Sequence, residues 1–119
     1  MGLTVTAEDR DGLVLVTLTG ELDIYTVPTF RQDLERFDPA EVQVVVDLSD
    51  VTLLDSSGLG ALVSLLNRAR GSSRSLGLVC PHRHLRRVFE ITGLRRAFVF
   101  GDDIEAVRTG LAAAATDTA

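Results

Sequence analysis

A short polar segment between two apolar runs constrains this chain more than any other feature. Residues 42–48 have the nearly continuous apolar pattern of a strand that is covered on both faces. Further along, four apolar residues are spaced to share one face of a helix: Leu59, Leu62, Val63 and Leu66. Between the two runs lies Asp55-Ser56-Ser57-Gly58, whose side-chain oxygens can accept the free amides of a first helical turn. The sequence therefore predicts a central strand followed by a capped helix.

Capping accounts for one of these hydroxyls but not for a serine doublet followed by Gly58. A glycine opens space close to the backbone, and the beginning of a helix favours negative charge. A serine held there is exposed, and its phosphorylation would place a dianion on amide donors. We interpret the segment as a site that carries a phosphate or binds one.

The other elements follow from apolar spacing and turn residues. Residues 3–8 and 13–19 have the pattern of two strands, and Asp11-Gly12 between them is a strong hairpin signal. Thr26 is predicted to cap a helix with Pro28 in its first turn, which stops at Asp38-Pro39. A strand at 76–80, a helix from Pro81 to Gly93, a short strand at 97–100 and a helix over 102–113 follow. The order ββαβαβαβα predicts an α/β fold, a mixed β-sheet of about four to five strands with helices packed on it.

Length and composition indicate one ordinary domain. The 119 residues are enough for a hydrophobic core, and 45% are apolar while 24% are charged. We expect residues 1–119 to form a single domain with its core over about 3–111 and a frayed tail over 112–119. No run approaches the roughly 18 apolar residues of a membrane span, and no signal peptide is recognisable. Cys80 is the only cysteine, which fits a reducing compartment, so we expect a cytoplasmic protein.

The charged residues narrow the classes of function. All twelve basic residues are arginines, and the absence of lysine excludes a phosphate-binding P-loop and Schiff-base chemistry. Residues 1–60 hold three arginines against twelve acidic residues, whereas residues 61–119 hold nine against five. With a net charge of −5 and few aromatic residues, the chain is a poor partner for nucleic acid. A protein with complementary charged patches is the expected partner.

The sequence gives weaker support to two other hypotheses, a hydrolase active site and a metal site. A serine on a strand-to-helix turn, together with His82 and His84, is reminiscent of a hydrolase, but the first glycine of G-x-S-x-G is missing. Cys80, His82 and His84 alternate as metal ligands could, yet Pro81 breaks the strand that such alternation requires. We therefore predict no enzyme activity, no metal and no cofactor.

Two further groups have open interpretations. The arginines from Arg83 to Arg96 form either a solvated face or a surface that orients an acidic partner. Ala61 and Leu65 lie off the inner stripe of the second helix and either fill the edge of the core or form the dry centre of an interface, which we slightly favour.

Four motifs in register resemble a known family. They are Gly20-Glu21-Leu22-Asp23, Val46-Asp47-Leu48-Ser49-Asp50-Val51, Leu54-Asp55-Ser56-Ser57-Gly58-Leu59-Gly60 and Phe89-Glu90-Ile91-Thr92-Gly93-Leu94. Together they are similar to the anti-sigma factor antagonists, which are single STAS domains of bacteria. The resemblance runs from about residue 3 to about residue 111 in the family's order, and it implies a STAS-type sheet.

The resemblance also implies a mechanism called partner switching. The unphosphorylated antagonist binds an anti-sigma factor, which is also a serine kinase, and so releases a sigma factor. The kinase phosphorylates the antagonist at the position of Ser56, and a metal-dependent serine phosphatase restores it. Tyr25 and Val27 depart from the polar or small residues common at their positions. The positions implied to bind the partner are Glu21, Asp23, Tyr25, Asp55, Ser57, Gly58, Leu59 and Gly60.

An alternative of another class stays open. The chain could be a STAS scaffold that is not phosphorylated, or a module within a larger complex that senses a small ligand or a nucleotide. In that case Ser56 would serve only to begin the helix. The two readings differ in whether a kinase and ATP modify Ser56.

Overall fold

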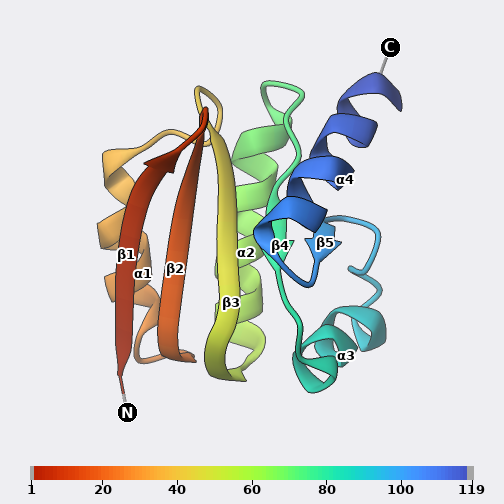
Figure 1. The fold of residues 1–119 in the computed structure, drawn as a ribbon. Coiled ribbons are helices and arrows are strands. Elements are labelled where there is room, and N and C mark those ends of the chain that lie inside the picture. The colour runs from red at the N-terminus through yellow and green to blue at the C-terminus, as the bar shows by residue number, and fades with distance from the viewer. Residues whose placement is uncertain (1, 118–119) are drawn as a thin grey trace.

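A computed structural model describes residues 2–117 as a sheet with helices on both faces (Figure 1). The strands are β1 (Leu3–Arg10), β2 (Leu13–Leu22), β3 (Gln43–Leu54), β4 (Gly77–Val79) and β5 (Val99–Gly101). The helices are α1 (Val27–Asp33), which continues into a short 3₁₀ turn (Leu34–Arg36), α2 (Ser56–Arg70), α3 (Arg83–Ile91) and α4 (Ile104–Asp117). The predicted α/β class and the order of the elements are confirmed.

The sheet is mixed and has β3 at its centre. Its order is β1-β2-β3-β4-β5, with β1 antiparallel to β2 and every other pair parallel. The hairpin turn has positive φ at Asp11 (50°) and Gly12 (91°), as a two-residue turn that matches the twist of its strands requires. In β3, Val44 and Val46 belong to the larger core and Val45 to a smaller one, so both faces of this strand are covered, as predicted.

β2 and β3 are both longer than the sequence predicts. β3 continues past Leu48 to Leu54, and β2 continues past Thr19 to Leu22. The two ends pair in register, with Leu22 opposite Leu54. The loop that follows β2 and the helix that follows β3 therefore begin side by side at the carboxyl edge of the sheet.

The helices form two layers. α1, α2 and α3 cover one face over the larger core, and α4 covers the other over Leu13, Leu15, Val45 and Val79. Ala61 and Leu65 of α2 are only 3% and 6% exposed. The interface role slightly favoured for these two residues is therefore wrong, because they are buried in the core on the side where α2 meets α1. No helix within residues 2–117 is long and apolar enough to cross a membrane.

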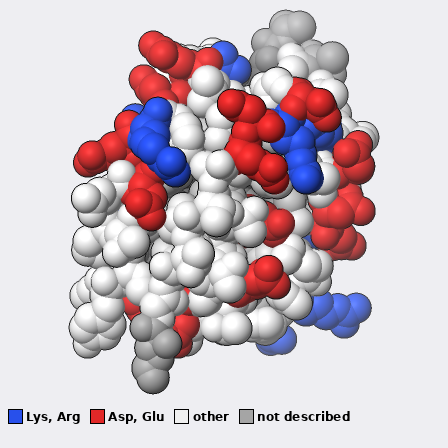
Figure 2. Space-filling model, turned by 60° about the vertical axis from the view of Figure 1, so that its left-hand side comes forward, with Lys and Arg blue, Asp and Glu red and all other residues white. Residues whose placement is uncertain are grey.

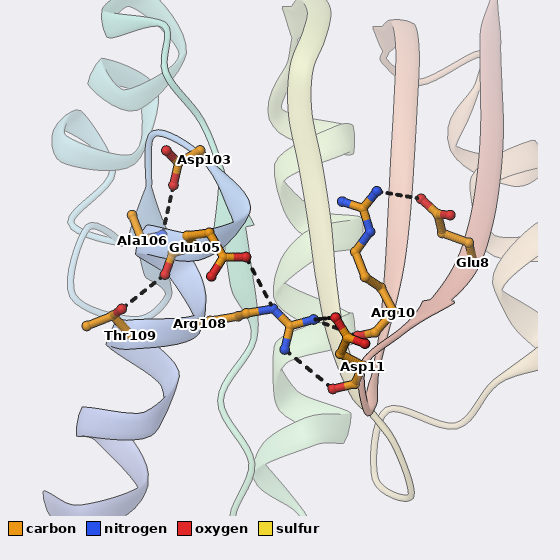
Figure 3. A network of polar contacts seen from close by, with 8 residues as sticks. All are labelled: Glu8, Arg10, Asp11, Asp103, Glu105, Ala106, Arg108 and Thr109. Atoms are coloured by element: carbon orange, nitrogen blue, oxygen red, sulfur yellow. Dashed lines mark hydrogen bonds and ion pairs between the residues drawn. The ribbon is translucent and has the colours of Figure 1, made fainter.

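Arg108 fastens α4 to the hairpin turn (Figure 3). Its guanidinium donates to Arg10 O at 2.7 Å and lies 3.7 Å from the Asp11 carboxylate and 3.9 Å from the carboxylate of Glu105. The helix continues to Asp117, beyond the predicted end at residue 113. The predicted frayed tail of residues 112–119 thus overlaps a helix as far as Asp117, and residues 118–119 lie outside the described part of the chain.

Candidate functional site

Asp55 joins the two segments that meet at the carboxyl edge of the sheet. One oxygen of its carboxylate, Oδ1, accepts from Gly58 N at 2.9 Å and caps α2. The other, Oδ2, accepts from Ile24 N at 3.1 Å, and Asp55 N donates to Leu22 O at 3.3 Å. Asp55 therefore starts the helix and holds the loop after β2 against it.

Ser56 and Ser57 are the first two residues of α2, and neither supplies the cap. The first main-chain bond of the helix runs from Leu59 N to Asp55 O at 2.9 Å, and Gly58 N is taken by the carboxylate. The amides of the two serines thus precede the hydrogen-bonded part of the helix, where donors are free to hold an anion. The Ser56 residue is exposed, whereas Ser57 is half-buried.

Gly58 allows a close approach between α2 and the end of β2. A Cβ placed on Gly58 would lie 2.3 Å from Leu22 O and 2.9 Å from side-chain atoms of Leu22 and Leu54. Leu59 is 7% exposed and points into the core, whereas Gly60 is exposed and a Cβ placed on it would meet no atom within 4 Å. Their roles as partner contacts stay predictions.

The loop after β2 is held by its own side chains. Asp23 Oδ1 accepts from Tyr25 N at 2.9 Å and from Thr26 N at 3.0 Å. Thr26 Oγ1 donates to Glu21 O at 2.7 Å and accepts from Asp23 N at 3.0 Å. Thr26 is the N-cap residue of α1, as predicted, but its hydroxyl binds the preceding loop and makes no capping hydrogen bond to the helix.

These contacts predict different effects for two substitutions of Asp23. Asp23→Asn keeps an acceptor oxygen and should change the free energy of unfolding by no more than about 0.5 kcal/mol. Asp23→Ala removes the acceptor of two loop amides and should cost roughly 1 kcal/mol. Urea unfolding of both variants measures the difference. Equal stability of the two variants would show that the carboxylate does not hold the loop.

Exposed apolar side chains lie on the two segments that meet at Asp55 and Ser56. Tyr25 is 86% exposed, Ile24 62% and Leu53 43%. Ile24 is joined to Asp55 through its amide, and Leu53 lies beside Glu21 in the sheet. The sequence analysis named Tyr25 but missed Ile24 and Leu53. Ile24 could have been found, because an isoleucine in a turn between Asp23 and Tyr25 is expected to be exposed. We use the name switch surface for the exposed residues Ile24, Tyr25, Leu53 and Ser56 of these two segments.

The molecule is acidic on the side where its N-terminal strand lies. Figure 2 shows more acidic than basic side chains on this face, with a broad uncharged area at its lower left. This agrees with the excess of acidic residues within residues 1–60. A phosphate added to this half of the chain would increase a charge that is already negative.

His82, His84 and Cys80 make no hydrogen bond to Ser56 or Ser57. His82 Nε2 is 2.6 Å from Ser49 O, and its ring lies 5.6 Å from that of His84. Cys80 is buried, and burial raises the pKa of its thiol. Within residues 2–117 no group of three His, Cys, Asp or Glu side chains is arranged to hold a metal ion.

Known proteins share the sequence pattern and the fold of this chain. The sequence model of the STAS domain family matches residues 4–107. The anti-sigma-B factor antagonist of Listeria monocytogenes is 34% identical over 96 residues, which cover 79% of this chain and 84% of that protein. The crystal structure of an anti-sigma factor antagonist from Mycobacterium paratuberculosis has a TM-score of 0.82 and 28% identity, covering 92% of this chain and 94% of that one. The Bacillus cell fate determinant SpoIIAA, solved in its phosphorylated form, has a TM-score of 0.67 and 21% identity, covering 89% and 98%.

Proposed function

The chain belongs to the STAS domain family, among the anti-sigma factor antagonists, and we propose that it is a partner-switching antagonist controlled by phosphorylation of Ser56. In its unphosphorylated form it binds an anti-sigma factor that is also a serine kinase, and so releases a sigma factor. A metal-dependent serine phosphatase returns the phosphorylated chain to this form. The protein acts in the cytoplasm as the substrate of these enzymes and catalyses no reaction itself.

One observation supports this proposal above the others, namely the position of Ser56. The residue is exposed and is the first of α2, and Asp55 rather than Ser56 supplies the cap. Its hydroxyl is therefore not needed to begin the helix and is available to a kinase. A phosphate there would lie near free helix amides, which stabilise an anion by about 0.3–1 kcal/mol.

Phosphorylation should separate the partners without refolding the chain. It adds about −1.5 to −2 charges beside Asp55 and on the more acidic half of the sequence. SpoIIAA in its unphosphorylated and its phosphorylated form superposes on this chain with the same TM-score of 0.67, which supports a fold that keeps its shape on phosphorylation. Loss of binding then results from repulsion and steric conflict at the switch surface.

The proposal is tested with an anti-sigma factor kinase and ATP. Incubation should add one phosphate to the chain, visible in its intact mass, and should prevent the two proteins from eluting together in size-exclusion chromatography. If no cognate kinase modifies the chain while binding persists in the presence of ATP, the chain is a scaffold of the alternative kind.

The exposed tyrosine gives a prediction about affinity. Tyr25→Ala should weaken binding to the anti-sigma factor about tenfold or more, because an exposed aromatic side chain at the centre of an interface is a common source of binding energy. The melting temperature should stay within about 2 °C of the wild type, since the side chain is 86% exposed. Calorimetric titration and a thermal melt measure the two quantities.

Ile91→Ala is the matched control. Ile91 is also exposed, at 76%, but it lies at the end of α3 and not on the switch surface. Its removal should cost less affinity for the anti-sigma factor than Tyr25→Ala does. Equal losses from both substitutions would contradict the assignment of Tyr25 to the interface.

A further inference from the structure

A second charged surface lies on α3 and the loop that follows it. Five of the twelve arginines fall within residues 83–96, together with Glu90 as the only acidic residue. On α3 the residues Arg83, Arg86, Arg87, Glu90 and Ile91 have the spacing of one helical stripe, and Leu85 and Phe89 are buried on the opposite side. With three arginines against Glu90, this stripe is basic in a chain whose net charge is −5.

The stripe borders two hollows that share residues. One hollow, of about 310 Å³, lies between α3 and β5 and is lined by Arg86, Glu90, Arg95, Phe98 and Phe100. The other, of about 530 Å³, is lined by Arg86 and Glu90 again, with two further arginines and Ile91 of α3. Arg86 and Glu90 line both hollows, which therefore adjoin each other, and we call the two together the arginine groove.

Arg86 is held in place, whereas the other arginines of the groove are not. Its Nε donates to Cys80 O at 2.6 Å, its Nη2 bonds Asp102 at 2.9 Å, and its guanidinium lies 5.7 Å from the centre of the Phe100 ring. Arg87 and Arg95 are exposed and form no ion pair with any of residues 2–117. They can therefore pair with carboxylates of another molecule.

The dimensions and lining of the groove indicate the kind of occupant. Arg83 and Ile91 are eight residues apart on a helix, which corresponds to about 12 Å, the length of roughly four residues of extended peptide. Each hollow also has an apolar wall, Ile91 in one and Phe98 with Phe100 in the other. An extended chain with carboxylates and an apolar side chain matches this arrangement better than a compact anion does.

We propose that an acidic, extended segment of a protein partner, carrying at least one bulky apolar side chain, docks in the arginine groove. The groove is separate from the switch surface in the residues that form it. The proposal does not depend on phosphorylation of Ser56. It gives this acidic chain one surface that attracts a negatively charged protein.

The test uses the ¹⁵N-labelled full chain and a synthetic glutamate-rich peptide with one central phenylalanine. Nuclear magnetic resonance titration should shift amides within residues 83–102 and leave the loop after β2 unchanged. Arg87→Gln with Arg95→Gln should raise Kd about tenfold or more. Arg31→Gln with Arg36→Gln changes the net charge equally, on α1 and the 3₁₀ turn that follows it, and should leave Kd within about twofold.

Four results would overturn the proposal. The same peptide with glutamines could bind equally well, or the Arg31 and Arg36 variant could lose as much affinity as the groove variant. Inorganic tripolyphosphate could displace the peptide while binding at least as tightly, which would make the groove a site for a small anion. Ser56→Asp could weaken peptide binding, which would place the peptide on the switch surface. Unchanged binding to Ser56→Asp supports the groove even if the proposed switch fails.

Discussion

Ser56→Ala should abolish phosphorylation by the anti-sigma factor kinase and leave a constitutively active antagonist. The side chain that the substitution removes makes no capping bond, since Asp55 caps α2, so the fold should be retained. Kinase incubation followed by intact mass analysis should show no added phosphate, while affinity for the anti-sigma factor in the absence of ATP should match the wild type. A release assay for the sigma factor should then show activity that ATP no longer suppresses.

Two further variants complete this experiment. Ser57→Ala should remain a substrate, because Ser57 is half-buried whereas Ser56 is exposed. Ser56→Asp should bind the anti-sigma factor poorly, since it adds a negative charge beside Asp55. Peptide mapping that placed the phosphate on Ser57 or on a threonine of the tail would contradict the assignment of Ser56 as the phosphorylated residue.

Gly58→Ala should destabilise the fold by about 1–3 kcal/mol, the usual cost of inserting a methyl group into a packed site. The added Cβ would lie 2.3 Å from Leu22 O, which is main chain and cannot rotate away. The end of β2 and the start of α2 would have to separate, and with them the contact between Asp55 and Ile24. The melting temperature should therefore fall by several degrees, at roughly 3–6 °C per kcal/mol for a domain of this size.

Gly60→Ala is the control, on the same helix and two residues away. Apart from its chain neighbours and the backbone of its own helix turn, no atom lies within 4 Å of a Cβ at this position, and Gly60 is exposed. Replacing a glycine inside a helix by alanine stabilises it by up to about 1 kcal/mol. The two substitutions should therefore shift the melting temperature in opposite directions, and a shared direction would contradict the close approach at Gly58.

Much of the fold could be predicted because local patterns carry it. Asp11-Gly12 specifies the hairpin turn, and the run of valines within residues 42–48 specifies a strand covered on both faces. The second half of β3 could not be predicted, because Ser49, Asp50 and Thr52 interrupt the apolar pattern. Pairing with β2, rather than local propensity, extends the strand there to Leu54.

The sequence predicted the part of the candidate site that depends on neighbouring residues, but not its long-range contacts. A helix start at Asp55-Ser56 follows from residue types, and the structure has it. The bond from Ile24 N to Asp55 joins residues 31 positions apart, so no short segment of sequence contains it. Ala61 and Leu65 were misplaced for a related reason, since their burial depends on where α1 packs and not on the spacing within α2.

The fastening of α4 by Arg108 has a consequence for how this domain can change. Arg108 acts at the end of the sheet where β2 begins, and the switch surface lies where β2 ends, ten residues further on. That separation is about 30 Å. It is several times the distance beyond which dissolved salt screens the interaction between exposed charges. Substitutions at the two ends should add independently in free energy. Substitutions during evolution can thus change the stability of the domain without changing which partner it recognises.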